Sequence, residues 1–325
     1  MPDRGRDASS PSDREHMRAS ATIAGTDVDQ ARALYQEAYR GEDFRITTTD
    51  RPFRYRYRVS GDDEVSVRAN LFSGAVSGSF EHPGEYVVTW ITEGEGSHSA
   101  RDGESVLVLR KAKLHPVGEP TGFRFRDHVQ SLVHVQASFL EAVAAEVEGH
   151  RGGQIAFDHA VLPGAEALAA WNGTLAAAAP VIVARDATVL AREAAKRDVA
   201  LALLETFSHA PTAGGPVEPA PTARVREAAD LLRARSGEPV RPSDAAAELG
   251  VPLASLAEGF RRTFDATPDA WLQQARLERV RSALTEQGLE GEASVELGRR
   301  WGFYDELGFV DAYGAAFGTD PRRRD

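Results

Sequence analysis

Apolar and polar residues alternate along the first half of the chain. From Phe53, the apolar side chains of Phe53, Tyr55 and Tyr57 fall on one side and arginines fall on the other, until Gly61. A period of two residues is typical of a strand with one solvated face. We therefore expect a strand here, preceded by a short helix over residues 26–39.

Similar short apolar or alternating runs recur before residue 137. The predicted strands cover residues 65–71, 85–92, 105–110, 122–126 and 129–136. Turns are predicted where Gly, Ser, Asp and Pro gather, at residues 73–74, 94–96, 102–103 and 118–120. Many short strands with no helices between them favour an antiparallel barrel or sandwich over a parallel sheet.

Helical spacing begins after the last predicted strand. Ser138 and Glu141 have the spacing of a capping box, and Gly149 is a suitable helix end. Two further helices are predicted over residues 165–179 and 188–208, the second capped by Asp186.

The last third of the chain contains one helical pattern twice. In the first copy, residues 242–249 have helix-forming composition, Gly250 permits a sharp turn, and residues 252–264 carry apolar side chains at helical spacing. In the second copy, Ser294 is the expected cap of a short helix, Gly302 makes the turn, and a helix follows from residue 305 to 317. Each copy predicts a helix-turn-helix unit.

A single long helix is predicted between the two units. Pro268 suits its first turn, apolar residues continue to Leu284, and Gly288 follows its end. At ~1.5 Å per residue, residues 269–287 span roughly 28 Å, about the distance between successive major-groove faces of DNA. The spacing therefore predicts two helices placed in neighbouring grooves.

Three separated motifs resemble the DNA-binding domain of AraC/XylS-type transcriptional regulators. They are the linker-helix pattern ARLERVRSAL at residues 275–284, RWGF at 300–303, and FVDAYGAAFGTDP at 309–321. The strand-rich first half resembles, by arrangement, the cupin-like sensor domain of such regulators. The resemblance implies an α+β multidomain protein with an N-terminal antiparallel cupin-like barrel, flanking helices, and a C-terminal all-α domain with two helix-turn-helix units joined by a linker helix.

Composition divides the chain into four segments. Residues 1–20 are polar and are expected to be disordered, residues 21–208 form the sensing domain, the Pro/Gly-rich stretch 209–221 is the linker, and residues 222–325 form the helical domain. The helices before the linker either form a dimer contact, as the resemblance implies, or close the barrel.

The resemblance assigns DNA contacts to exposed positions of both units. The candidates are Ser243, Ala254, Ser255, Glu258, Arg261, Arg262, Arg299, Arg300, Glu306 and Asp311. Basic and amide side chains read base edges and hold phosphates, yet Ala254 and Glu258 stand where such groups are common, and Gly308, Gly314 and Ala316 do so in the second unit. The predicted DNA-contacting surface therefore has fewer basic and amide side chains than is usual in the family.

Charge leaves two interpretations open. The chain carries a net −11, and residues 222–325 hold 15 basic against 18 acidic residues, whereas DNA-binding domains are usually basic. In the first interpretation the protein is an effector-controlled transcription regulator that binds double-stranded DNA, with RNA polymerase as a candidate partner and a homodimer as the expected assembly. In the second it is a degenerate relative that binds a ligand or a protein.

Other sequence features predict neither a catalytic site nor a membrane-spanning segment. The chain has no cysteine, no apolar signal segment and no run of 18 apolar residues, which predicts a cytoplasmic protein. Nucleophile, phosphate-loop and zinc-protease motifs are absent. The histidines His82, His98, His115, His128 and His134 stand singly on different predicted strands and loops, so no metal, no cofactor and no enzyme activity is expected.

An effector is expected inside the barrel, because small-molecule sites are concave and mostly apolar with a few polar groups. The candidate lining residues are Phe72, Tyr86, Trp90 and Phe125. Ordinary core packing explains each of these aromatic side chains at least as well and is the favoured interpretation.

Overall fold

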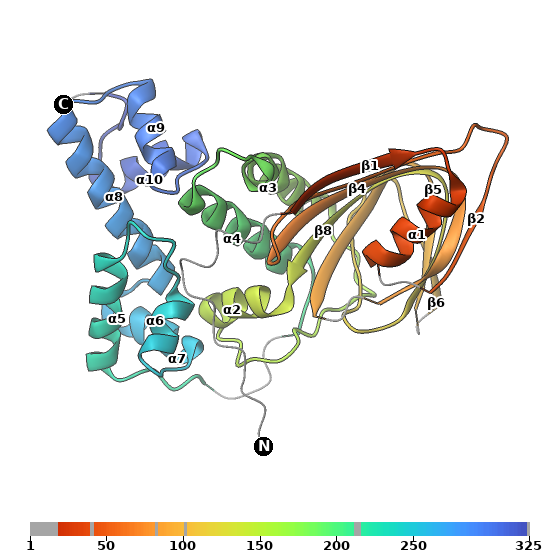
Figure 1. The fold of residues 1–325 in the computed structure, drawn as a ribbon. Helices are drawn as coiled ribbons and strands as arrows, with labels where there is room; N and C mark the ends of the chain where they lie inside the picture. The colour runs from red at the N-terminus through yellow and green to blue at the C-terminus, as the bar shows by residue number, and fades with distance from the viewer. Residues whose placement is uncertain (1–18, 40–41, 82–83, 101–102, 211–215, 324–325) are drawn as a thin grey trace, which may run out of the picture.

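The computed structural model describes residues 19–39, 42–81, 84–100, 103–210 and 216–323. Residues 19–210, here the N-terminal region, contain a curved antiparallel sheet followed by three helices, and residues 216–323, here the C-terminal region, are helical. Figure 1 shows the sheet at one end of the molecule, the C-terminal region at the other, and helices α2 (Ala137–Glu148) and α4 (Val189–Thr206) between them. This confirms the α+β class and the order of its parts.

The sheet has eight strands in the described residues. They are β1 (Ala19–Gly25), β2 (Glu42–Thr47), β3 (Arg54–Gly61), β4 (Val65–Phe80), β5 (Glu85–Ala100), β6 (Gly103–Val106), β7 (Lys113–Leu114) and β8 (Thr121–Gln136). Their order is β1-β3-β4-β8-β5-β6, with β2 beside β4 and β7 beside β5, and every pairing is antiparallel.

Three long strands replace most of the short predicted ones. β4, β5 and β8 each have 16 residues and run through the predicted turns at 73–74 and 94–96 and through the predicted break before Val129. At these places the strands shift their pairing register and continue. The shifts lie next to one another across β4, β8 and β5, where the Asp127 carboxylate accepts a 2.8 Å hydrogen bond from the Gly74 amide. The predicted chain reversals there are wrong, because the glycines bend the strands instead of ending them.

Gly94 explains why a glycine is needed at this level. Its φ is +79°, and a Cβ atom there would lie 2.3 Å from the Asp127 carbonyl oxygen. The backbones of β5 and β8 therefore approach so closely that no side chain fits between them.

Three strands were not predicted: β1, β2 and the two-residue β7. β1 pairs with β3 and forms the edge of the sheet, so residues 19–20 belong to the sheet and their predicted disorder is wrong, while residues 1–18 lie outside the described residues. Most of the β1 side chains are exposed, so its place depends on backbone pairing, which leaves no apolar pattern. β2 is similar, with only Phe44 buried among its described side chains.

Helix α1 (Val28–Tyr39) confirms the first predicted helix and lies against the sheet (Figure 1). Its Ala31, Tyr35 and Tyr39 join aromatic and aliphatic side chains of the sheet in one cluster, here the inner core. The other face of the sheet packs against α2, α3 (Ala165–Val183) and α4 in a second cluster around Trp171, here the outer core.

Two helices of the outer core have N-terminal caps that differ from the predicted ones. α2 (Ala137–Glu148) begins one residue before Ser138, and the Glu141 carboxylate accepts a 3.4 Å hydrogen bond from Tyr86 Oη, so the predicted capping box does not form. α4 (Val189–Thr206) is capped by Thr188, whose hydroxyl accepts a 3.1 Å hydrogen bond from the Ala191 amide, and not by Asp186.

Helix α3 (Ala165–Val183) extends past the predicted end and includes Pro180. By length and composition it is the one helix of the described ranges that could cross a membrane, a test that core helices of folded proteins also pass. Here its buried Trp171, Leu175 and Ile182 lie in the outer core, beside α4.

Six helices make up the C-terminal region as it is described. They are α5 (Thr222–Ala234), α6 (Pro242–Glu248), α7 (Leu253–Phe264), α8 (Pro268–Gln287), α9 (Glu292–Arg300) and α10 (Glu306–Phe317). The start of α9 corrects one detail: Gly291 is its N-cap, and the fully buried Ser294 lies inside the helix, donating a 2.6 Å hydrogen bond to the Gly291 carbonyl.

Candidate functional site

Helices α6 and α7, here unit one, form the first helix-turn-helix. Gly250 makes the turn at a φ of +62°. Leu256 and Phe260 of α7 are fully buried in a cluster that also contains side chains of α5, α6 and α8. This packing fixes the position of α7 relative to α5, α6 and α8.

Helices α9 and α10, here unit two, form the second helix-turn-helix. Gly302 turns the chain at a φ of +98°, and Asp305 caps α10 by accepting a 2.6 Å hydrogen bond from the Gly308 amide. Phe309 is buried against Gly298 of α9, where a Cβ atom would lie only 2.9 Å from its ring. A glycine at residue 298 therefore sets how closely the two helices pack.

The two second helices differ in exposure. Among the twelve residues of α7, all of them described, Arg262 alone is exposed, and the candidate Ala254 is 6% exposed. In α10, half of the twelve are exposed: Glu306, Leu307, Gly308, Asp311, Ala315 and Ala316. The exposed face of α10 has two carboxylates and no cation.

The arginines of α7 already have partners inside the molecule. Arg262 Nε donates a 2.7 Å hydrogen bond to Glu258, one turn earlier. Arg261 Nη2 donates to the backbone carbonyls of Glu146 and Val147 in α2, at 2.6 and 3.0 Å. These two oxygens lie in the last turn of α2, where helical carbonyls lack intrahelical partners and a cation is favoured. Arg261 therefore caps the C-terminal end of α2.

Apart from Ser255, which lies in α7, the remaining candidates lie on other helices. Arg299 and Arg300 are exposed on α9 and pair with Glu296 at 3.6 and 3.8 Å, while Glu306 pairs with Arg322 at 3.6 Å. Ser243 lines a cavity between the two regions, and the Ser255 carbonyl accepts a hydrogen bond from the Ala220 amide. The ten candidates therefore do not form one continuous surface in this conformation, and their contact with DNA stays a prediction.

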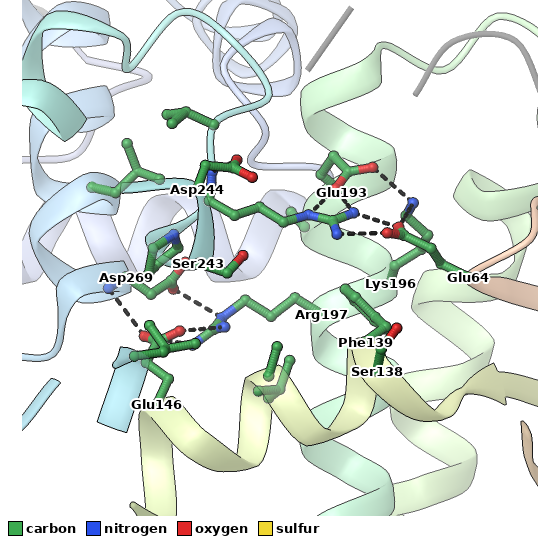
Figure 2. Close-up of a pocket in the computed structure, with 18 of the residues that line it drawn as sticks. Glu64, Ser138, Phe139, Glu146, Glu193, Lys196, Arg197, Ser243, Asp244 and Asp269 are labelled. Carbon is green, nitrogen blue, oxygen red and sulfur yellow. Dashed lines mark hydrogen bonds and ion pairs between the residues drawn. The ribbon is translucent and has the colours of Figure 1, made fainter. Parts of the chain in front are cut away.

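The cavity between the regions has a volume of about 790 Å³ and is lined by α2, α4 and the start of α6 and α8. Figure 2 shows charged side chains from both regions pointing toward one another across it. On one side, Arg241, the residue before α6, donates a 2.7 Å hydrogen bond to Glu64 and also pairs with Glu193. Lys196 Nζ lies 2.7–2.8 Å from Asp62, Glu64 and Glu193.

The three carboxylates around Lys196 are close enough to one another for a cation. The Lys196 ammonium lies among them, so it supplies the charge that a metal ion would bring. Burial alone would raise the pKa of Glu64, but Arg241 and Lys196 lower it to about 2. The cluster is therefore an ion-pair network that joins the N-terminal region to unit one.

A second group of charges surrounds Glu146 of α2, whose side chain is 2% exposed. Its carboxylate accepts hydrogen bonds from Arg197 Nη1 and Nη2 at 2.9 and 3.0 Å and from the Asp269 amide at 3.1 Å. Arg197 also pairs with the Asp269 carboxylate at 3.1 Å (Figure 2). Burial raises the pKa of Glu146 to about 7, although Arg197 acts in the opposite direction.

Unit two contacts the N-terminal region through α4. Tyr304 Oη donates a 2.5 Å hydrogen bond to Asp198, and the hydroxyl of Thr188 donates to the Arg299 carbonyl at 3.4 Å. Gly302 lies against Leu190, whose carbonyl oxygen would be 3.3 Å from a Cβ atom there. α4 therefore contacts both units along its length.

The structure separates the four candidate effector residues. Phe72 and Phe125 lie in the inner core, each stacked on His128, with ring centroids 5.9 and 4.6 Å apart. Tyr86 lies in the outer core, and Trp90 packs against it. Neighbouring positions on a strand point to opposite faces, so these two cannot share an inner site with Phe72 and Phe125.

The inner core also gathers polar groups that the strand pattern did not reveal. The rings of His98 on β5 and His115 after β7, which lie on different segments as predicted, are 4.3 Å apart, while His82 lies outside the described residues. Asn70 Nδ2 donates a 3.0 Å hydrogen bond to Gln130 Oε1 on the neighbouring strand. A cavity of about 40 Å³ lies among these side chains, enough space for one or two water molecules.

Burial keeps the central histidine neutral. His128 is 3% exposed, and burial lowers its pKa to about 3, although Asp127 acts in the opposite direction. It therefore lies uncharged between Phe72 and Phe125 at neutral pH. Only the pairing of strands β4, β5 and β8 brings these side chains together, so a search for a local H-x-H spacing could not find them.

Comparison with known proteins identifies the C-terminal region. Residues 245–323 match the model of a helix-turn-helix domain family. A probable thc operon regulatory protein of Rhodococcus erythropolis is 32% identical over 104 residues, which are 32% of this chain and 31% of the relative. The chain thus matches about a third of the length of that curated relative.

Solved structures are similar over parts of the fold. The AraC-like transcriptional activator CuxR is 12% identical with a TM-score of 0.43, covering 82% of this chain and 96% of its own. A cupin-superfamily sugar phosphate isomerase from Silicibacter pomeroyi is 16% identical with a TM-score of 0.22, covering 25% of this chain and 59% of its own. The family match shows that the C-terminal region is a helix-turn-helix domain, as the resemblance to AraC/XylS-type regulators predicts.

Proposed function

We propose that the protein is a sequence-specific, double-stranded-DNA-binding transcription regulator controlled by a small molecule that binds inside the sheet of the N-terminal region. The observation that carries the proposal is the helix-turn-helix match over residues 245–323, which includes most of unit one and all of unit two. α7 is the helix best suited to reading DNA, because its last turn carries Arg261 and Arg262.

The effector part of the proposal rests on the inner core. Phe72, Phe125 and the neutral His128 form stacked apolar faces, while Asn70 and Gln130 supply polar groups, a combination typical of small-molecule sites. Because the cavity holds only about 40 Å³, an effector larger than a few atoms has to displace side chains on binding.

The test is binding of the full chain to a labelled duplex from the upstream DNA of its own gene, titrated with salt against a scrambled duplex. Specific binding is expected, and Arg262→Ala should weaken it and reduce the salt slope by about one. Arg226→Ala, an exposed arginine on α5 outside both units, is the matched control. Equal affinity for the two duplexes, with and without ligands shown to bind the N-terminal region, would refute the regulator proposal.

The alternative is a helical domain that no longer reads DNA. The specific observation in its favour is α10, whose exposed face carries Glu306 and Asp311 and no cation. Negative charge opposes a phosphate backbone, so unit two contributes little DNA affinity in either interpretation.

A further inference from the structure

Unit one is covered by the N-terminal region on the side that carries Arg261. We propose that the contact of α7 with the C-terminal end of α2 is autoinhibitory, so that unit one binds DNA only after this contact opens. The inference rests on the proposed DNA binding and goes beyond it, because it states what restrains that activity and where.

The first step is the state of Arg261. Its guanidinium donates to the Glu146 and Val147 carbonyls at 2.6 and 3.0 Å, and its side chain is 34% exposed. A donor held by the end of α2 cannot at the same time hold a phosphate or a base edge. The geometry therefore places α2 in competition with DNA for one of the two arginines of α7.

The second step is the cover over α7 itself. Apart from Arg262, no residue of this fully described helix is exposed, and α7 packs directly against α2. A helix lying in a major groove needs one open face, since the groove is about 12 Å wide and an α-helix with its side chains fills it. α10, with half of its residues exposed, shows the openness that α7 lacks.

The third step is that the contact can separate without unfolding either region. The apolar clusters of α5–α8 and of α2–α4 are distinct, and the groups that meet beside unit one are mainly charged and polar. A cavity of about 790 Å³ lies between them. Polar interfaces between domains usually open more readily than cores, so a docked and an open form of the same chain are expected.

The fourth step is that the contact extends beyond Arg261. Glu146 accepts from the Asp269 amide at the start of α8, and Arg197 pairs with both Glu146 and Asp269. The end of α2 therefore holds α7 and α8 together. A ligand that shifts the sheet can move α2, because α2 follows β8 directly at residue 137.

A reversible lock tests the proposal in the full chain. The protein has no cysteine, so Ser138→Cys in α2 and Gln273→Cys in α8, both lining the cavity and outside α7, can be joined by a cleavable bis-maleimide. We expect the linked protein to bind the upstream duplex at least tenfold more weakly than the same sample after cleavage. Equal affinity before and after cleavage would overturn the inference.

A charge-reversal pair tests the same contact from the other direction. Glu193→Lys on α4 should repel Arg241 and open the contact, whereas the exposed Glu205→Lys on the same helix makes the same charge change away from it. Hydrogen exchange of residues 253–264 should rise only in Glu193→Lys, with roughly tenfold tighter DNA binding than in Glu205→Lys. Faster exchange with unchanged DNA affinity would contradict the inference.

The two proposals fail in different ways. If the cleaved, linked and charge-reversed proteins all bind the duplex with one affinity, DNA binding stands and the autoinhibition is wrong. If none of them binds the duplex more tightly than a scrambled one, while residues 253–264 exchange freely in Glu193→Lys, the proposed function itself fails and the inference falls with it.

Discussion

Units one and two have the same backbone plan and different surroundings. α7 has two arginines in its last turn but is covered by the N-terminal region, whereas α10 is open to solvent but has no arginine or lysine. The chemistry for DNA and the access to DNA therefore lie on different helices. This difference teaches that a helix-turn-helix pattern gives the positions of two helices, while their surroundings decide which of them can act.

The largest expected effect is a difference in stability between variants at the two contacts of the C-terminal region with the N-terminal region, one beside unit one and one beside unit two. Arg241→Ala removes one of the two cationic partners of Glu64 and Glu193 and leaves Lys196, and we expect a loss of about 3 kcal/mol in the free energy of unfolding, typical of breaking a buried ion pair. Tyr304→Phe removes one hydrogen bond beside unit two and should cost about 1 kcal/mol. Urea unfolding of both variants measures the difference, and equal losses would contradict the distinct character of the two contacts.

The next effect concerns pH and the two carboxylates at the cavity. Because the pKa of Glu146 is raised to about 7, its contribution to stability is fully present below about 4.5, the value in the unfolded chain, and is lost as pH rises through 7. Relative to Glu146→Gln, the wild-type protein should gain about 1–3 kcal/mol between pH 8 and pH 5.

Glu64 provides the control with the opposite sign. Its pKa is lowered to about 2, so its contribution is present above about 4.5 and is lost as pH falls toward 2. The wild-type protein should therefore lose stability relative to Glu64→Gln on acidification in that window. Chemical unfolding at each pH measures the stability difference between the wild-type protein and each of the two variants. If both differences change in the same direction with pH, the charges at the cavity do not behave as described.

The smallest expected effects come from one substitution made in both second helices. A Cβ atom at Gly259 of α7 would lie 2.5 Å from Val225, so Gly259→Ala should destabilise by roughly 1–2 kcal/mol through overpacking. At Gly314 of α10 the nearest atom is 3.8 Å away, so Gly314→Ala should stabilise by about 1 kcal/mol through helix propensity. Melting temperatures that shift in the same direction would refute the contrast between the tight packing of Gly259 against α5 and the open surroundings of Gly314.

The C-terminal region was predictable because its signals are local. Apolar spacing, Gly250, Gly302 and Pro268 each act within one or two helical turns, and the predicted helices lie close to the observed ones. The match over residues 245–323 confirms the motif resemblance. The cap at Ser294 was wrong because a serine can equally bond to a carbonyl inside a helix, as it does here to Gly291.

The sheet was predictable in kind and not in detail. Glycines at residues 74 and 94 predict turns when only neighbours along the chain are considered, yet each lies where another strand or loop approaches closely. The pairing of Phe72, Phe125 and His128, and the separation of Tyr86 and Trp90, follow from strand register, which depends on contacts far apart in sequence. The covering of Arg261 by α2 is likewise a property of how the two regions meet.

Helix α4 affects how quickly the contact between the C-terminal region and the N-terminal region can open and close. Its Lys196 and Glu193 belong to the contact with unit one, while Thr188, Leu190 and Asp198 touch unit two, so one helix holds the C-terminal region at two places. When the contact with one unit breaks, the contact with the other unit keeps the released unit at an effective concentration on the order of millimolar. Rebinding is then an intramolecular event, and a lasting release requires both places to be free at the same moment.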